Sequence, residues 1–442
     1  MLKLILKNLW ARRRRNGWLL AELIIVGVIS WVILDPVIVL THDRHIPMGY
    51  DADRLCLISL GALQPQAPGY DEQVQDSVMM MNGYLNMVRR VCDFEGVELT
   101  TPVLGFCYPN SEGNGNNELI AEGDTLKHPV MFMNFLPHTN FFETYGFCPG
   151  KGRSLEQLSD YDYTQNDIVL SENTAQNIFG TVNVEGKRCV RYHNQDTTYL
   201  PVIGTVGTFK AYSDWRPSPV YFSPLLVVDI EDIPEYARIL VRLREGVSME
   251  RFLHDFRPWM VKELRAGNLF ARSIQSYDDI IRETEAGSST PIYRRNLAMA
   301  IFFLVNLCLG VIGTFWLQTR TRCEEVGVML SFGATPGYVM RLLMGEGVVL
   351  TVFASFISFL LYLQYAIKEG LDEGMNWMRE VKTYWVSDFA SHFVIVSLII
   401  LLILLVVVLI GIYIPARSIS RITPTDALRD CLLYTSPSPR DS

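Results

Sequence analysis

The chain has 442 residues and a formal net charge of −8, with 49% hydrophobic and 19% charged residues. A chain of this length has room for two or three domains. So high an apolar content beside so many charges indicates membrane spans joined to a sizeable water-soluble part, rather than either alone. For this acidic chain we expect a lipid bilayer as the immediate environment and no nucleic-acid partner.

Residues 1–17 are predicted to form a basic amphipathic helix on the cytoplasmic surface of the membrane. Lys3 and Lys7 lie off its apolar face, and a run of arginines from Arg12 to Arg15 follows. The apolar face carries Leu2, Ile5, Leu6, Leu9 and Trp10. An alternative stays open, in which the segment extends the first span into the cytoplasm and its charges act as topology signals.

Four segments each approach the roughly 20 apolar residues needed to cross a bilayer. We predict transmembrane helices at residues 18–40, 297–317, 348–367 and 393–414. The basic N-terminal segment favours a cytoplasmic N-terminus, and four spans then return the C-terminus to the cytoplasm. Arg294 and Arg295 oppose this orientation but are outnumbered. We therefore expect a multi-pass protein of the bacterial inner (cytoplasmic) membrane.

Residues 41–296 are predicted to form a large mixed α/β domain of two lobes in the periplasm. Strand-like runs alternate there with amphipathic helices, such as 248–266 with its N-cap Ser248. The stretch Gly105–Gly123 is rich in Asn and Gly and is predicted to be a loop. The expected fold class is an α-helical membrane domain of four transmembrane helices, with a large mixed α/β extracytoplasmic domain inserted between helices 1 and 2.

Five of the eight cysteines fall in this inserted domain: Cys56, Cys92, Cys107, Cys148 and Cys189. An oxidising compartment permits one or two disulfides among them. Their number is odd and their spacing assigns no pairing. No CxxC pair occurs, so a zinc site is not expected.

The remaining segments connect or follow the spans. Residues 318–347 are predicted to be a cytoplasmic loop, and residues 368–392 a short periplasmic loop. Residues 415–430 follow the last span, where Pro415 is predicted to break the helix. Residues 431–442 change composition abruptly and resemble translated adapter sequence, so they are treated as an artefactual tail.

Motifs for catalysis and metal binding are missing from the sequence. Gly150-Lys151 lacks the phosphate-loop glycine five positions earlier, because Tyr145 stands there. His42 and His45 are interpreted as part of a solvated turn. The acidic cluster between the last two spans is interpreted as a solvated loop and comprises Glu369, Asp372 and Glu373. We expect no catalytic residue, no metal and no cofactor in this chain.

The charged, glycine-punctuated stretch between the second and third spans carries the strongest signal. Glu325-Val-Gly-Val-Met-Leu-Ser-Phe-Gly-Ala-Thr335 resembles the FtsX-like permease domain of ABC systems. Pro415-Ala-Arg417 … Pro424-Thr-Asp-Ala-Leu-Arg429 resembles the closing motif of that family. Together the two motifs cover roughly residues 297–429.

The inserted domain is similar to a MacB-type periplasmic core through the stretches Asp167–Gly180 and Tyr199–Gly207. Ser331 and Ile419 depart from the alanines usual in the FtsX-like family. The N-terminal ATPase that MacB carries is absent as well. The chain therefore resembles the stand-alone permeases, whose ATPase is a separate polypeptide.

The resemblance implies the permease subunit of a MacB/LolCE-type ABC system. A cytoplasmic ABC ATPase would bind ATP and Mg, and its closure would move the periplasmic domains by mechanotransmission, without substrate crossing the bilayer. The chain would pair as a homodimer, or as a heterodimer with a related permease. If the role is efflux, the resemblance implies two further partners, a membrane-fusion protein and an outer-membrane channel. The substrates implied are peptides, drugs or lipoproteins outside the inner membrane.

The resemblance also implies which residues meet the ATPase. The residues expected to shape the docking element are Glu324, Glu325, Gly327, Gly333, Ala334 and Arg341. The residues of the closing motif are Pro415, Arg417, Pro424, Ala427, Leu428 and Arg429. Carboxylates would pair with basic residues of the ATPase, and Gly333 would permit a turn that a side chain would block. The alternative is an ordinary interfacial loop with its charges among lipid headgroups.

A different class of function remains open. The inserted domain could sense an antimicrobial peptide or envelope stress and signal to a kinase, or regulate a cell-wall hydrolase. A neighbouring sensor-kinase gene would favour signalling, whereas a membrane-fusion protein gene would favour efflux.

Overall fold

The computed structural model describes residues 2–11, 13–72, 77–105, 107–111, 113, 115–193, 196–227, 232–320, 323–374 and 384–420. These residues divide into two compact units, a helical unit and an α/β unit that begins at Leu40 and includes Pro291. Among the described residues, four helices are long and apolar enough to cross a membrane, and the α/β unit lies in sequence between the first and the second. The expected fold class is therefore confirmed.

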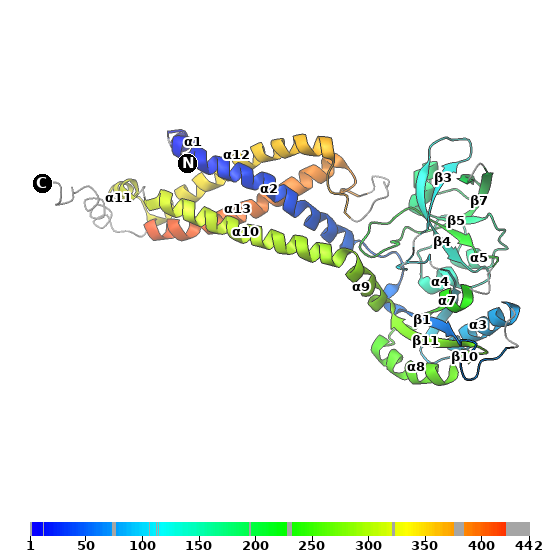
Figure 1. Cartoon of the computed structure of the whole chain (residues 1–442). Coiled ribbons are helices and arrows are strands. Elements are labelled where there is room, and N and C mark those ends of the chain that lie inside the picture. The colour runs from blue at the N-terminus through cyan, green and yellow to red at the C-terminus, as the bar shows by residue number, and fades with distance from the viewer. Residues whose placement is uncertain are drawn as a thin grey trace. The chain divides into compact units, whose positions relative to one another are not determined.

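The helices of the helical unit run further than the apolar segments that predict them (Figure 1). In lipid a helix satisfies its own backbone polar groups, so it continues until the chain reaches water. They are α1 (Leu2–Ala11), α2 (Arg13–His45), α10 (Ser289–Arg320), α11 (Cys323–Ser331), α12 (Pro336–Glu369) and α13 (Phe389–Ser420).

Two expectations for these segments are corrected. Residues 318–347 are not a loop, since α11 and the first turns of α12 fill most of the described part. Pro415 does not break its helix, because α13 continues to Ser420. One missing N–H does not end a helix whose next turns are packed, and Ala416 and Ile419 are buried against the other helices.

The core of the helical unit is centred on Trp31 of α2, which is fully buried. Its ring stacks on Tyr362 of α12 at a centroid distance of 4.6 Å and on Phe393 of α13 at 5.2 Å. Glycines let the helices approach closely: a Cβ at Gly27 would lie 2.4 Å from Ser358 Oγ. Small residues at helix contacts are typical of membrane helix packing.

The first lobe of the α/β unit is a five-stranded antiparallel sheet in the order β10-β11-β1-β9-β2. Helices α3 (Ser77–Cys92) and α8 (Met249–Glu263) pack on it. On β1 the side chains of Leu55 and Leu57 enter one core, while those of Cys56 and Ile58 enter another. This alternation follows the two-residue period of a strand. The strands are β1 (Leu55–Ala62), β2 (Val97–Val103), β9 (Arg238–Leu243), β10 (Arg265–Ala266) and β11 (Leu269–Ser276).

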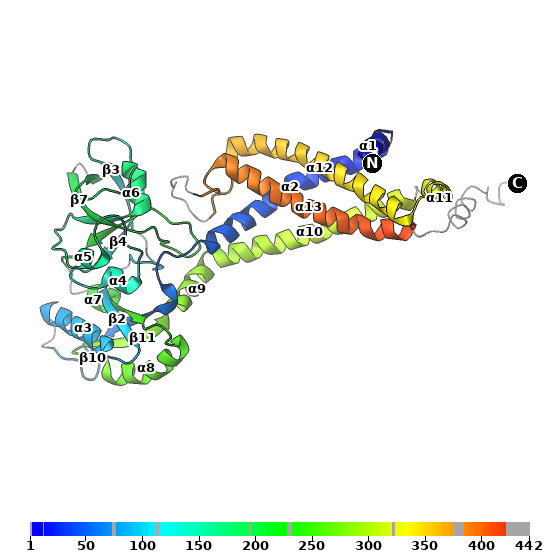
Figure 2. The same ribbon diagram turned by 180° about the vertical axis from the view of Figure 1, so that it is seen from behind.

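The second lobe is a closed barrel in the order β3-β4-β8-β5-β7-β6. Its strands β3, β4 and β7 are labelled in Figure 2. The pairs β4–β8 and β5–β7 are parallel, and the other pairs are antiparallel. The strands are β3 (Gly115–Ala121), β4 (His128–Phe135), β5 (Ile168–Ser171), β6 (Arg188–His193), β7 (Asp196–Val206) and β8 (Val220–Pro224). Short helical elements complete the unit: η1 (Ala52–Arg54), α4 (Phe141–Tyr145), α5 (Leu155–Ser159), α6 (Glu172–Phe179), α7 (Asp232–Tyr236) and α9 (Tyr277–Gly287).

Strand β3 lies inside the stretch 105–123 that is expected to be a loop. Its polar residues do not prevent pairing, because the side chain of Asn117 donates to Tyr221 Oη at 2.6 Å and the backbone joins β4. The five cysteines of this unit are free thiols, so none of the disulfides that the compartment permits is formed. Three of these thiols are buried: Cys56, Cys107 and Cys189.

Candidate coupling elbow and membrane-helix junction

A tight turn joins α11 to α12, at the place where the ATPase-docking element is expected. The N–H of Gly333 donates to Leu330 O at 3.1 Å, and that of Ala334 donates to Met329 O at 3.0 Å. This pair of bonds is the Schellman arrangement, which requires a left-handed residue just after the helix. Gly333 takes that position with a φ of +90°. The backbone conformation explains the glycine, since no atom within 4 Å would meet a Cβ there.

The next helix begins two residues later with a complete N-terminal cap. The Thr335 hydroxyl accepts from the N–H of Tyr338 at 3.3 Å, and Pro336 occupies the first turn. Both residue types are favoured at helix starts. The direction of the chain between α11 and α12 is thus set by caps on both sides of the turn.

The outer surface of this turn carries exposed apolar side chains beside charged ones. Phe332 is 89% exposed, and Val328 and Tyr338 are also exposed. Glu325 and Arg341 are exposed at either side of the turn, and Arg341 Nε donates to Gly337 O at 3.2 Å. We call Glu325, Val328, Phe332, Tyr338 and Arg341 the elbow patch.

The structure separates the six docking candidates by their surroundings. Glu325 and Arg341 belong to the elbow patch, and Gly333 forms its turn. Gly327 is buried and Ala334 is half-buried against the helical core, so these two contribute packing. Glu324 lies in α11, but its side chain is outside the described part of the chain.

Two residues of the closing motif are described. Pro415 is buried within α13, while Arg417 is exposed and donates to Tyr413 Oη at 3.1 Å. The other four fall outside the described residues: Pro424, Ala427, Leu428 and Arg429. So does the artefactual tail expected at 431–442.

Sequence reasoning did not include Phe332 among the docking residues, although it lies in the segment 318–347 predicted to be cytoplasmic and in the stretch Glu325–Thr335. Its position directly before Gly333 was the available signal, because Gly333 marks the turn.

Helix α1 contacts the start of α12, close to the elbow in sequence. Asn8 Nδ2 donates to Glu346 Oε1 at 3.3 Å, and a Cβ at Gly345 would lie 2.8 Å from Ile5. Ile5 is buried, whereas Leu6 and Trp10 are exposed. The amphipathic helix thus buries only part of its apolar face in the described protein.

A second polar contact that sequence reasoning missed lies at the far ends of the membrane helices. His392 Nε2 of α13 lies 2.8 Å from Asp35 Oδ1 of α2, and both residues are buried. His392 Nδ1 lies 3.0 Å from the carbonyl oxygen of Val386. The imidazole thus links the carboxylate of α2 to α13 and to the segment that precedes it.

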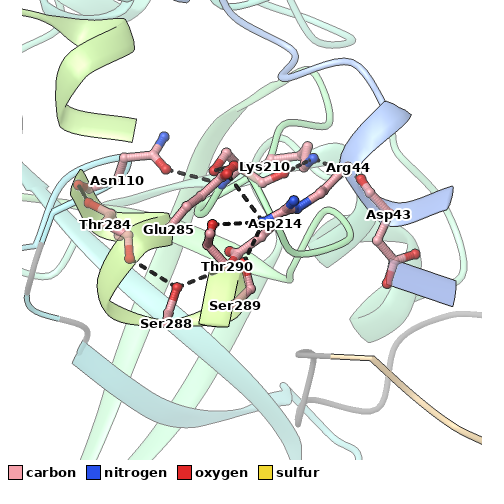
Figure 3. Close-up of polar contacts among 11 residues, drawn as sticks. Asp43, Arg44, Asn110, Lys210, Asp214, Thr284, Glu285, Ser288, Ser289 and Thr290 are labelled. Atoms are coloured by element: carbon pink, nitrogen blue, oxygen red, sulfur yellow. Dashed lines mark hydrogen bonds and ion pairs between the residues drawn. The ribbon is translucent and has the colours of Figure 1, made fainter. Parts of the chain in front are cut away.

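A buried to half-buried cluster of charges lies at the C-terminal end of α2 inside the α/β unit (Figure 3). Three segments supply it: the end of α2, the loop 210–216, and the connection from α9 to α10. We call it the junction. Its acidic members are Asp43, Asp214 and Glu285, and its basic members are Arg44, Lys210 and Arg216.

Arg44 joins the end of α2 to the start of α10. Its Nη2 donates to Ser289 Oγ and to Thr290 Oγ1, each at 3.1 Å, and it pairs with Glu285 Oε2 at 3.4 Å. Asp214 accepts from Ser288 Oγ at 3.0 Å. The outer ends of the first two membrane helices are therefore held side by side within the α/β unit (Figure 3).

Arg216 lies 3.6 Å from Asp43 Oδ2, and Asp43 also contacts His42 Nδ1 at 2.9 Å. Asp43 is fully buried. His42 therefore contributes to a buried ion network rather than to a solvated turn alone. Among the described residues, no group of three or more His, Cys, Asp or Glu side chains could hold a metal ion.

Residues 297–424 match the family described as FtsX-like permease C-terminal. No curated protein matches the chain. Two solved structures are similar to part of it. One is the periplasmic region of MacB from Actinobacillus actinomycetemcomitans, at 14% identity over 55% of this chain and 98% of that one, with a TM-score of 0.32. The other is a domain of a candidate permease from Porphyromonas gingivalis, at 18% identity over 51% and 92%, also with a TM-score of 0.32.

The family match confirms the resemblance drawn from the stretch Glu325–Thr335 and from the start of the closing motif. It spans α10 to α13, including the elbow patch. Residues 297–424 are thus similar to the C-terminal part of FtsX-like permeases.

Proposed function

We propose that the chain is the membrane-spanning permease subunit of an ABC system, and that a separate cytoplasmic ATPase docks on the elbow patch. ATP and Mg would be bound by that ATPase. In this proposal the N- and C-termini lie in the cytoplasm of the inner membrane, and the α/β unit lies in the periplasm.

One observation carries this proposal: an exposed phenylalanine at the tip of a capped turn, with charges of both signs beside it. Phe332 is 89% exposed, Val328 and Tyr338 near it in the sequence are exposed as well, and grouped exposed apolar side chains rimmed by polar residues mark interaction sites. Aromatic anchors bordered by polar groups are the usual energetic centres of protein interfaces.

A continuous helix supports mechanical coupling. Helix α10 begins at Ser289, which Arg44 binds in the junction, and it ends at Arg320, three residues before α11. Its 32 residues correspond to a rod of roughly 48 Å. Movement of the elbow by the ATPase would therefore reach the α/β unit through one helix, without substrate crossing the bilayer.

The proposed assembly contains two permease copies, or one copy and a related permease. Substrates would be peptides, drugs or lipoproteins of the envelope, with a membrane-fusion protein and an outer-membrane channel added in an efflux system. A permease dimer with two ATPases gives each elbow its own docking partner.

The test is purification from the native host in mild detergent, followed by mass spectrometry and an ATP-hydrolysis assay. The wild-type chain should bring a stoichiometric ATPase. Phe332→Ala should weaken that association by about 2 kcal/mol, roughly 30-fold, because it removes the anchor. The matched control is Phe302→Ala, which removes a similarly exposed ring from α10 within the apolar span.

Glu325→Lys combined with Gly333→Val should abolish the association while the protein still inserts into the membrane. Recovery of a kinase or a wall hydrolase, without any ATPase, would replace this proposal by the signalling function. If Phe332→Ala and Phe302→Ala recovered equal amounts of the ATPase, the docking surface would have to lie elsewhere on the chain.

A further inference from the structure

Lys210 is a buried lysine at the centre of the junction. Its side chain is inaccessible to solvent. Its Nζ donates to Asp43 O at 2.9 Å, to Ile46 O at 3.4 Å and to Ser213 O. Two of these acceptors belong to the end of α2 and the residue after it, and the third belongs to the lysine's own loop.

The position of the ammonium explains why it stabilises the end of the helix. The last carbonyls of a helix have no partner inside it, and the C-terminal end carries the negative pole of the helix dipole. A cation that donates to those carbonyls supplies their missing hydrogen bonds and also interacts favourably with the negative pole of the dipole. Arg44 in the last turn adds positive charge to the same end.

Burying a lysine at this position costs free energy. Burial lowers the pKa of Lys210 to about 8, although Asp43, Asp214 and Glu285 oppose that shift. Arg44 and Arg216 are the cations that face the same space. An apolar side chain would fill the volume without this penalty. The lysine is therefore explained by the bonds that it makes, rather than by packing.

The loop that carries Lys210 is itself held in place independently of α2. The N–H of Ser213 donates to Asn110 Oδ1 at 3.0 Å, and Ser213 Oγ donates to Glu285 at 2.7 Å. The backbone N–H of Lys210 donates to Met48 O at 2.8 Å. Lys210 thus extends from a fixed loop to the end of the helix.

We propose that Lys210 is the positioning residue that fastens the end of the first membrane helix to the α/β unit. A displacement of α2 is then passed to the α/β unit rather than absorbed by unravelling of the helix end. The fastening itself is a property of this chain alone. Its use in transmitting movement rests on the proposed function.

The first measurement is hydrogen exchange of the full-length chain in nanodiscs. Lys210→Met removes the ammonium and keeps the length of the side chain, and Lys210→Gln is the milder variant should Met prevent folding. Two controls are matched to it. Asn110→Ala removes a buried bond to the same loop but leaves the contact with α2, and Lys151→Met removes an exposed lysine of the same unit.

The expected result is exchange at least tenfold faster at residues 41–46 in the Lys210 variants, with the strands of both lobes unchanged. Asn110→Ala should loosen the loop without affecting residues 41–46. Unchanged exchange at residues 41–46 in both Lys210 variants would overturn the proposal, and so would an equal increase in Asn110→Ala.

The second measurement reports how firmly the end of α2 is held to the rest of the α/β unit. A residue that only stabilises the fold would not change this property. Spin labels on non-canonical residues at Leu126 and at His45, the last residue of α2, define a distance distribution within the α/β unit, since both side chains are exposed. This distribution should broaden in Lys210→Met and stay unchanged in the two controls. An unchanged width in Lys210→Met would overturn the proposal. Neither measurement needs the ATPase, so a wild-type chain that recruits none would refute the proposed function alone.

Discussion

The junction and the elbow patch differ in how far their side chains are exposed to water. At the junction, Asp43 and Lys210 are removed from water and every segment is held by several partners. At the elbow, Phe332 and its neighbours are exposed, and the turn is held by its own caps. Substitutions at the junction should therefore change the folding free energy. Substitutions of the exposed side chains of the elbow patch should change binding instead.

The largest effect is expected for Asp43→Ala. This change removes the carboxylate 3.6 Å from the buried Arg216, and breaking a buried ion pair by removing one partner costs about 3–5 kcal/mol. For a unit of this size the melting temperature should fall by roughly 10 °C. Thermal unfolding of the full chain measures it, with the fully exposed Asp162→Ala as the control. Equal losses in both variants would contradict a special role for the buried carboxylate.

The next effect is a dependence of stability on pH. Folding lowers the pKa of Lys210 from 10.5 to about 8, so the unfolded chain holds this proton over a range where the folded chain has released it. The free energy of unfolding should therefore rise between about pH 8 and pH 10.5, by at most about 3 kcal/mol from this group. Denaturant unfolding at fixed pH values measures the slope. Lys210→Met should remove this contribution, and an identical slope in that variant would refute it.

A smaller loss is expected for Gly333→Ala. The left-handed φ of +90° costs an L-residue about 1–2 kcal/mol, although the space there is open. Gly337 is the matched control, because it lies within the first turn of α12 and also has no atom near its missing Cβ. Gly337→Ala should be neutral or slightly stabilising, since alanine favours helix. Chemical unfolding of both variants tests the difference.

The smallest change in stability is expected for Phe332→Ala. An 89% exposed ring contributes little to folding, so the free energy of unfolding should change by less than about 0.5 kcal/mol. The same variant should lose the ATPase. A stability loss above 1 kcal/mol would mean that the ring packs inside the protein, and would remove the contrast with the junction.

Sequence reasoning could find the spans and the turn, because apolar length and a glycine after a helix are local signals. Gly333 is an example, since its role depends only on the residues around it. The junction could not be found this way: Lys210 and Asp43 are 167 positions apart, and each looks like an ordinary surface charge. Strand β3 was not predicted for a related reason. Its composition is polar and rich in glycine, but pairing with the distant strands β4 and β6 outweighs that local preference.

The contacts of Arg44 with Ser289 and Thr290 also bear on chain entropy. They bring together the two points where the α/β unit begins and ends. The membrane helices that continue from these points are packed against each other, and Glu22 of α2 accepts from Thr314 of α10 at 3.5 Å. The unit is thus a loop of roughly 245 residues whose ends stay together even when it unfolds. Closing such a loop in advance removes about 5 kcal/mol of the entropic cost of folding, as a cross-link would. The same unit cut free of its helices would have to recover that cost from its own core.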